Sequence, residues 1–190
     1  MGHGILRAMS APLLIVPGYS NSGPRHWQSH WERLLPGALR VRMPDWDAPE
    51  LEAWVASLDA AIAACGEPPV LVTHSLGGTT AAHWAARHRR PVRGALLVAP
   101  PDLEHPDVPA PILGFAPTPR QRLPFPSILV ASRDDPYATF ERSEALARDW
   151  GSRLEDAGPA GHINSDSGLG DWPRGQALLD SLLQPSGSWK

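Results

Sequence analysis

The stretch Val70-Leu-Val-Thr-His-Ser75-Leu-Gly-Gly78 runs from apolar residues, through a turn of small residues, into an alanine-rich segment with helical periodicity. It is a variant of the G-x-S-x-G pattern, in which a strand and the following helix approach closely and a serine projects from the turn. Ser75 is therefore predicted to adopt a strained conformation where a strand meets a helix N-terminus. Thr73 replaces the first glycine of the pattern. The alternative is an ordinary serine N-cap.

Outside this stretch, short apolar runs alternate with longer segments of helical periodicity. This alternation is typical of β-α-β units and a mostly parallel sheet. The predicted strands cover residues 13–16, 39–43, 70–74, 95–98, 128–131 and 153–155. The predicted helices cover residues 24–35, 50–64, 76–88, 140–150 and 172–183. Because most strands are apolar on both faces, we expect an α/β fold of three layers, αβα, with a mostly parallel six-stranded sheet.

The chain is 190 residues long, a length that favours one domain, which we expect over residues 11–190. Residues 1–10 are predicted to be a disordered leader. Residues 100–126, here called the proline-rich excursion, contain nine prolines and little helical or strand periodicity. A loop of this length is usually a lid, a binding loop or a disordered segment. We interpret it as an excursion within the domain that could serve as a lid.

Composition and charge argue against several classes of protein. The net charge is −3 and the basic residues are scattered, so no nucleic-acid or membrane partner is expected. Cys65 is the single cysteine, which excludes an internal disulfide and a CxxC site. The apolar runs are too short to span a bilayer and no signal peptide is evident, so we expect a cytoplasmic protein. His26 and His30 have the spacing of zinc ligands, but no third ligand is evident, and we expect no metal.

A nucleophilic serine requires a base and an orienting carboxylate, which in this architecture follow the serine in the order Asp or Glu, then His. His162 follows the last predicted strand in a turn-rich loop, from which it could reach Ser75. His83 and His88 fall in the helix after Ser75, and His105 falls in the proline-rich excursion. We therefore favour His162 as the base, the alternative being a surface histidine.

Asp134 and Asp135 follow directly after the fifth predicted strand. Adjacent residues that leave a strand point to opposite sides, so only one of them can face a histidine. Pro136 restricts Asp135 to an extended conformation, which would fix its direction. We favour Asp135 as the carboxylate and interpret Asp134 as a solvated or loop-bracing neighbour. A turn-forming Asp-Asp-Pro without a catalytic role is the alternative.

The first predicted strand leads into a loop that contains Gly18 and Tyr19. Gly18 lets the backbone approach a ligand closely, and the amide of Tyr19 would complete an oxyanion hole with the amide of Leu76. Trp46 is a candidate for lining a substrate pocket, although it could simply pack. No G-x-G-x-x-G or complete phosphate-loop motif occurs, so no nucleotide cofactor is expected.

Four stretches of the chain together resemble one known family. They are Pro17-Gly-Tyr-Ser-Asn-Ser-Gly-Pro-Arg-His-Trp-Gln-Ser-His-Trp31, His74-Ser-Leu-Gly77, Ser132-Arg-Asp-Asp-Pro136 and Gly161-His-Ile-Asn164. The small α/β-hydrolases related to human retinoblastoma-binding serine hydrolase carry similar motifs, and the bacterial branch is the most similar. The resemblance implies an α/β-hydrolase fold without a large cap domain and a triad of Ser75, Asp135 and His162.

The sequence therefore predicts a serine hydrolase that cleaves small carboxylic esters or related acyl compounds without a cofactor. Two alternatives stay open. One is a protein-binding module that keeps the hydrolase fold, since a fold does not fix a function. The other is a thioesterase or acyltransferase that uses the same triad.

Overall fold

The computed structural model describes residues 11–184, so the predicted leader at residues 1–10 lies outside the described residues. The strands are β1 (Leu13–Val16), β2 (Ala38–Arg40), β3 (Val70–His74), β4 (Gly94–Val98), β5 (Ser127–Ala131) and β6 (Arg153–Asp156). They form one sheet in the order β2-β1-β3-β4-β5-β6, with every neighbouring pair parallel. The predicted α/β class and six-stranded sheet are confirmed.

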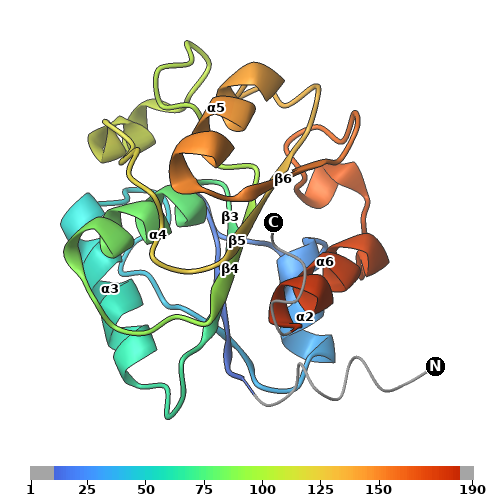
Figure 1. Ribbon diagram of the computed structural model, residues 1–190. Helices are drawn as coiled ribbons and strands as arrows, with labels where there is room; N and C mark the ends of the chain where they lie inside the picture. The colour runs from blue at the N-terminus through green and yellow to red at the C-terminus, as the bar shows by residue number, and fades with distance from the viewer. Residues whose placement is uncertain (1–10, 185–190) are drawn as a thin grey trace.

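Helices cover both faces of this sheet, which gives the three layers (Figure 1). The α-helices are α2 (Trp27–Leu34), α3 (Leu51–Ala63), α4 (Leu76–Arg87), α5 (Phe140–Trp150) and α6 (Pro173–Leu183). Two short 3-10 helices, η1 (Ala110–Phe115) and η2 (Ser165–Ser167), lie in the connections. Helices α3, α4 and α5 lie on one face, and α2 and α6 lie on the other (Figure 1). Within residues 11–184, no helix has both the length and the apolar character needed to cross a membrane.

Each face of the sheet has its own hydrophobic core, because successive strand residues point to opposite faces. In β3, Leu71 joins the core under α3, α4 and α5, whereas Val70 and Val72 join the core under α2 and α6. Trp27 and Trp31 of α2 are almost fully buried in the second core, where they account for much of the apolar surface that this helix buries.

Two predicted boundaries are wrong by up to three residues. The predicted strand at residues 39–43 pairs only over Ala38–Arg40. Val41 and Met43 are buried against the core beyond the end of the strand, so apolar burial there resembled strand periodicity. Helix α2 begins at Trp27, three residues later than predicted, because Nδ1 of His26 accepts a hydrogen bond from the Gln28 amide and caps the helix.

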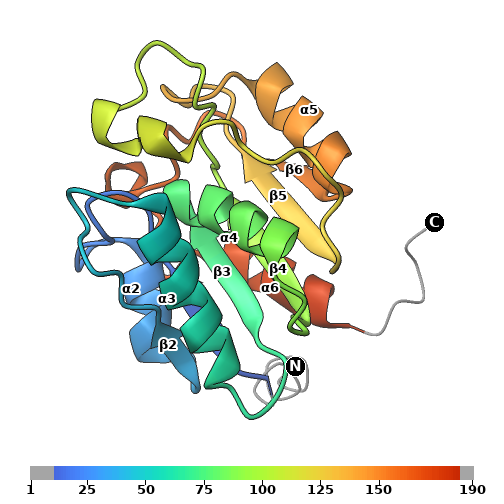
Figure 2. The same cartoon turned by 90° about the vertical axis from the view of Figure 1, so that its left-hand side faces the viewer.

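The proline-rich excursion packs against the rest of the protein above the carboxyl ends of the strands (Figure 2). Its apolar side chains that join the core under α3, α4 and α5 are Leu103, Val108, Ile112, Phe115, Leu123 and Phe125. Nε2 of His83 in α4 also donates a hydrogen bond to the carbonyl oxygen of Phe115, at 2.8 Å. Helix η1 was not predicted, because a 3-10 helix this short leaves little periodicity. The role of the excursion as a lid stays a prediction.

Candidate active site

The turn between β3 and α4 holds Ser75 in a strained backbone conformation. Ser75 has φ of 51° and ψ of −125°, a region that residues with a side chain rarely occupy. The turn is possible because Gly77 lies against β1: a Cβ atom there would lie 2.2 Å from the carbonyl oxygen of Val16. Gly78 in turn lies beside the hydroxyl of Thr73, where a Cβ atom would be 3.2 Å away. Thr73, which replaces the first glycine of the motif, is therefore accommodated because Gly78 has no side chain beside it.

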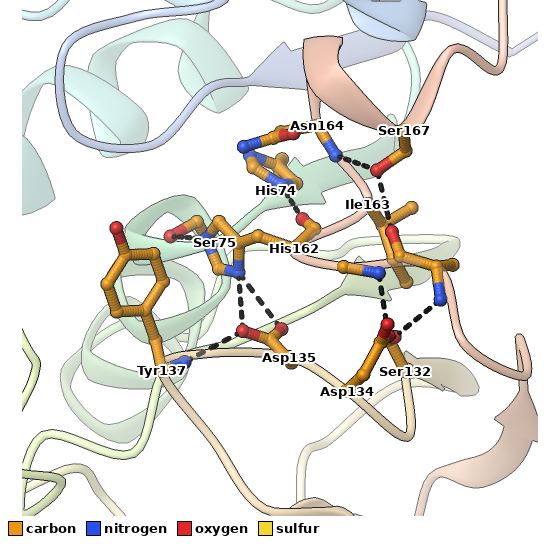
Figure 3. A network of polar contacts seen from close by, with 12 residues as sticks. His74, Ser75, Ser132, Asp134, Asp135, Tyr137, His162, Ile163, Asn164 and Ser167 are labelled. Carbon is orange, nitrogen blue, oxygen red and sulfur yellow. Dashed lines mark hydrogen bonds and ion pairs between the residues drawn. The ribbon is translucent and has the colours of Figure 1, made fainter.

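Ser75, His162 and Asp135 form a continuous hydrogen-bonded chain (Figure 3). Nε2 of His162 lies 2.9 Å from Oγ of Ser75, and Nδ1 lies 2.9 Å from both carboxylate oxygens of Asp135. The side chains of His162 and Asp135 are only 9% and 4% exposed, which shields this pair from water. Because a carboxylate accepts hydrogen bonds, Nδ1 of His162 carries a proton and Nε2 can accept the Ser75 hydroxyl.

The two adjacent aspartates point in different directions. The Tyr137 amide donates a hydrogen bond to Oδ1 of Asp135, which fixes the carboxylate below His162. Asp134 instead accepts hydrogen bonds from the Ser132 hydroxyl and the Gly161 amide, both at 2.8 Å (Figure 3). These two donors hold the pKa of Asp134 below its usual value. Asp134 therefore connects the β5 end to the loop that carries His162.

His74, which the sequence reasoning did not consider, positions the same loop from the other side. Its Nε2 lies 2.9 Å from the backbone carbonyl oxygen of His162, and the two rings meet edge to face (Figure 3). A carbonyl only accepts hydrogen bonds, so Nε2 of His74 is the donor. Burial lowers the pKa of His74 well below 6.5, which keeps the ring neutral. In this architecture the base follows the serine along the chain, so no pattern pointed to His74, directly before Ser75.

His26 and His30, the pair with zinc-ligand spacing, have different partners. His26 is buried and caps α2, and its ring meets that of His74 edge to face at a centroid distance of 4.6 Å. Nδ1 of His30 instead contacts the carboxylate of Asp171 at 2.8 Å. In the part of the chain that the structure describes, no three His, Cys, Asp or Glu side chains are grouped as metal ligands would be.

The burial of His26 predicts an acid-dependent loss of stability. Burial, together with the charge of Arg40, lowers the pKa of His26 from 6.5 to about 3. Between these values the unfolded chain binds a proton that the folded protein does not, so the free energy of unfolding falls as the pH falls. This residue alone is expected to lower it by about 2 kcal/mol between pH 7 and pH 5.

Urea unfolding at several pH values measures this loss. In the variant His26→Asn, whose Oδ1 can take the place of Nδ1 as the acceptor of the helix cap but does not titrate, the fall between pH 7 and pH 5 should be about 2 kcal/mol smaller. The comparison uses the change in the free energy of unfolding with pH. A general destabilisation of the variant would lower that free energy equally at every pH and leave the change unaltered. Equal slopes in the wild type and the variant would contradict the prediction.

The loop after β1 lies beside Ser75, as the predicted oxyanion hole requires. A Cβ atom on Gly18 would lie 2.8 Å from Cβ of Ser75 and 3.2 Å from the amide nitrogen of Leu76. Gly18 thus permits the close approach of the two loops. Among the described residues, the amides of Tyr19 and Leu76 donate to no protein acceptor. Both are therefore available to an oxygen bound near Ser75.

A cavity of about 240 Å³ opens at Ser75. Its lining residues are Tyr19, Asn21, His26, His74, Ser75, Pro101, Pro109, Ile112, Tyr137, His162, Asn164 and Ser165. Trp46 is not part of this lining; it packs on Trp54, with a ring-centroid distance of 5.6 Å. Tyr137, which the sequence reasoning missed, packs edge to face on His162 at 4.7 Å (Figure 3).

The parallel sheet, with a strained serine between its central strand and the next helix, defines an α/β hydrolase fold. The chain belongs to the serine hydrolase family, whose model matches residues 13–181, and it is therefore a hydrolase. The finer resemblance to the retinoblastoma-binding serine hydrolase and its bacterial branch stays a prediction. No curated protein matches the chain.

Several solved structures share this architecture. A YdeN-like hydrolase from Pectobacterium atrosepticum is 32% identical, with a TM-score of 0.83 over 95% of this chain and 97% of that one. The ydeN gene product from B. subtilis is 23% identical, with a TM-score of 0.74 over 91% of this chain and 98% of that one. A thermophilic esterase from Thermogutta terrifontis is 19% identical, with a TM-score of 0.63 over 92% and 91% of the two chains. The last two likenesses concern the fold alone.

Proposed function

We propose that the protein cleaves small carboxylic esters through a triad of Ser75, His162 and Asp135. The observation that carries the proposal is the hydrogen-bonded chain from Oγ of Ser75 through the His162 ring to the Asp135 carboxylate, with each link at 2.9 Å. The strained backbone of Ser75 also supports it, since nucleophilic serines of this fold stand on such a turn. The order Ser, Asp, His along the chain agrees with this architecture.

In the first half of the reaction, Oγ of Ser75 attacks the ester carbonyl carbon while Nε2 of His162 takes the hydroxyl proton. The amides of Tyr19 and Leu76 stabilise the oxyanion that develops on the carbonyl oxygen. The bond to the alcohol oxygen then breaks as His162 returns the proton to that oxygen. An acyl group remains on Ser75, and the alcohol leaves.

In the second half, water attacks the acyl carbon while Nε2 of His162 takes a proton from the water. The bond between the acyl carbon and Oγ of Ser75 breaks, and the proton passes to Oγ. The carboxylic acid leaves and the free hydroxyl is restored. Throughout, Asp135 holds the His162 ring in one tautomer and stabilises the imidazolium that forms.

The lining of the cavity at Ser75 favours an uncharged substrate. Among the described residues, no Asp, Glu, Lys or Arg side chain lines it, so a charged ester would find no counter-charge there. Its volume of about 240 Å³ favours a small acyl group. Thioesters have the same acyl chemistry, and thioester hydrolysis or acyl transfer is the second reaction that this triad could perform.

A fluorophosphonate probe tests the nucleophile directly, because it reacts covalently with an activated serine. Intact-mass measurement should show one adduct on the wild type, peptide mapping should place it on Ser75, and Ser75→Ala should give none. Hydrolysis of a panel of esters and thioesters of varied acyl length would then identify the substrate class. Undiminished labelling of Ser75→Ala would exclude Ser75, and a folded wild type that neither reacts nor turns over any ester would favour a protein-binding module.

A further inference from the structure

A second cavity lies next to the cavity at Ser75, and one residue borders both. The second cavity has a volume of about 290 Å³ and lies between the start of the proline-rich excursion, its later part and helix α5. Pro101 lines this cavity and also the cavity at Ser75. At this point the two cavities are therefore separated by no more than the width of one residue.

The second cavity is suited to an uncharged, apolar group. Its apolar lining residues are Pro100, Pro101, Leu103, Ala116, Pro117, Ala138 and Leu146. The charged side chains at its border are already paired. The Arg142 guanidinium donates to both carboxylate oxygens of Asp102, at 2.8 and 3.0 Å, and also to Glu104. Arg120 is paired with Asp149, so no charge in the lining is left to attract an ionic ligand.

The wall between the cavities is held firmly in place. Pro101 is buried, and its ring has no rotatable side chain that could swing aside. The amide of the next residue, Asp102, donates to the carbonyl oxygen of Tyr137 at 3.0 Å, and the Asp102 side chain is held by Arg142. The wall is thus anchored both to the loop that carries the catalytic carboxylate and to α5.

We propose that Pro101 limits the length of the substrate by closing the cavity at Ser75 against the second cavity. This inference rests on the proposed ester hydrolysis and specifies its substrate class, which is uncharged esters with a short chain. Each cavity alone is smaller than the pockets of about 300–1,000 Å³ that hold drug-sized ligands, whereas the two joined fall within that range. A smaller residue at position 101 would join them and admit a longer chain.

The experiment compares wild type, Pro101→Ala and Pro101→Gly on two series of uncharged esters. One series varies the acyl chain from acetate to decanoate, and the other varies the alcohol chain of acetate esters, which shows which part of the substrate faces Pro101. In the series whose chain faces Pro101, the ratio of kcat/KM for the eight-carbon chain to that for the four-carbon chain should be at least about 10-fold higher in the Pro101 variants than in the wild type. Even one methylene changes recognition by about that factor. Pro109→Ala is the matched control, since Pro109 lines only the cavity at Ser75.

A second arm measures binding without turnover. In the Ser75→Ala background, calorimetry with methyl acetate, methyl hexanoate and hexyl acetate should show that Pro101→Gly tightens binding of one of the two longer esters at least about 10-fold more than that of methyl acetate. Unchanged selectivity in both arms, or an equal change with Pro109→Ala, would overturn the role of Pro101. Failure of the proposed hydrolysis is seen separately, as a wild type that turns over no ester and is not labelled, and the binding arm then decides the inference alone.

Discussion

Replacing Ser75 with alanine is expected to lower kcat for an activated ester by about 10⁶-fold, and His162→Ala should lower it by a similar factor. The reason is that the hydroxyl and the imidazole act as one unit, joined by the 2.9 Å contact between Oγ and Nε2. The double variant should therefore be no slower than either single variant. Steady-state assays of the three variants and the wild type, on the same 4-nitrophenyl ester, measure these effects.

Circular dichroism and thermal unfolding serve as the control that each variant keeps its fold. Fluorophosphonate labelling adds an independent measure of the serine, because His162→Ala should slow labelling whereas Ser75→Ala should abolish it. Effects that multiply in the double variant would show that the two side chains act separately. That result would contradict the proposed proton transfer from Ser75 to His162.

Replacing Asp135 with asparagine should lower kcat by about 10⁴-fold while the fold is retained. Asp135 accepts from Nδ1 of His162 with both carboxylate oxygens, so the proton is kept on Nδ1 and Nε2 is free to accept. An asparagine can turn its NH₂ group toward Nδ1, which favours the tautomer with the proton on Nε2. In that tautomer the imidazole cannot take the proton of Ser75.

Asp134→Asn is the matched control, because it makes the same chemical change at the adjacent residue. Its carbonyl oxygen can still accept from the Ser132 hydroxyl and the Gly161 amide, which are the contacts Asp134 makes. We expect a loss of less than about 10-fold, the effect of weakening charge-assisted hydrogen bonds by about 1 kcal/mol. Steady-state kinetics of both variants on one ester measure these losses. A larger loss of kcat with Asp134→Asn than with Asp135→Asn would mean that the roles of the two aspartates are reversed.

Much of the fold could be predicted from sequence because its strands are short apolar runs that alternate with segments of helical periodicity. The six predicted strands are all present, and the small residues around Ser75 indicated a close approach of strand and helix. That Gly77 lies against β1 was not predicted. The prediction was weakest where burial and strand pairing diverge. Val41 and Met43 are buried without belonging to β2, so the alternation over residues 41–43 resembled three further strand residues.

The lining of the cavity at Ser75 was harder to predict than the hydrogen-bonded chain of Ser75, His162 and Asp135. The residues Ser75, Asp135 and His162 each follow a strand, and parallel strands bring such positions to one edge of the sheet. His26, His74 and Tyr137 reach the same cavity through contacts that no local pattern encodes, such as the bond from His74 to the backbone of residue 162. Trp46 was predicted either to line a substrate pocket or simply to pack, and it packs on Trp54 outside the lining.

The support of His162 by the protein core has a consequence for how this protein can diversify. His162 is held by His74 from β3 and, through Gly161, by Asp134 at the end of β5, so its position is set by the sheet. Several residues that line the cavity at Ser75, such as Pro109 and Ile112, belong instead to the proline-rich excursion. Substitutions there can reshape the cavity while Ser75, His162 and Asp135, the proposed catalytic groups, keep their positions. Catalysis and selectivity can therefore evolve at separate rates within one small chain.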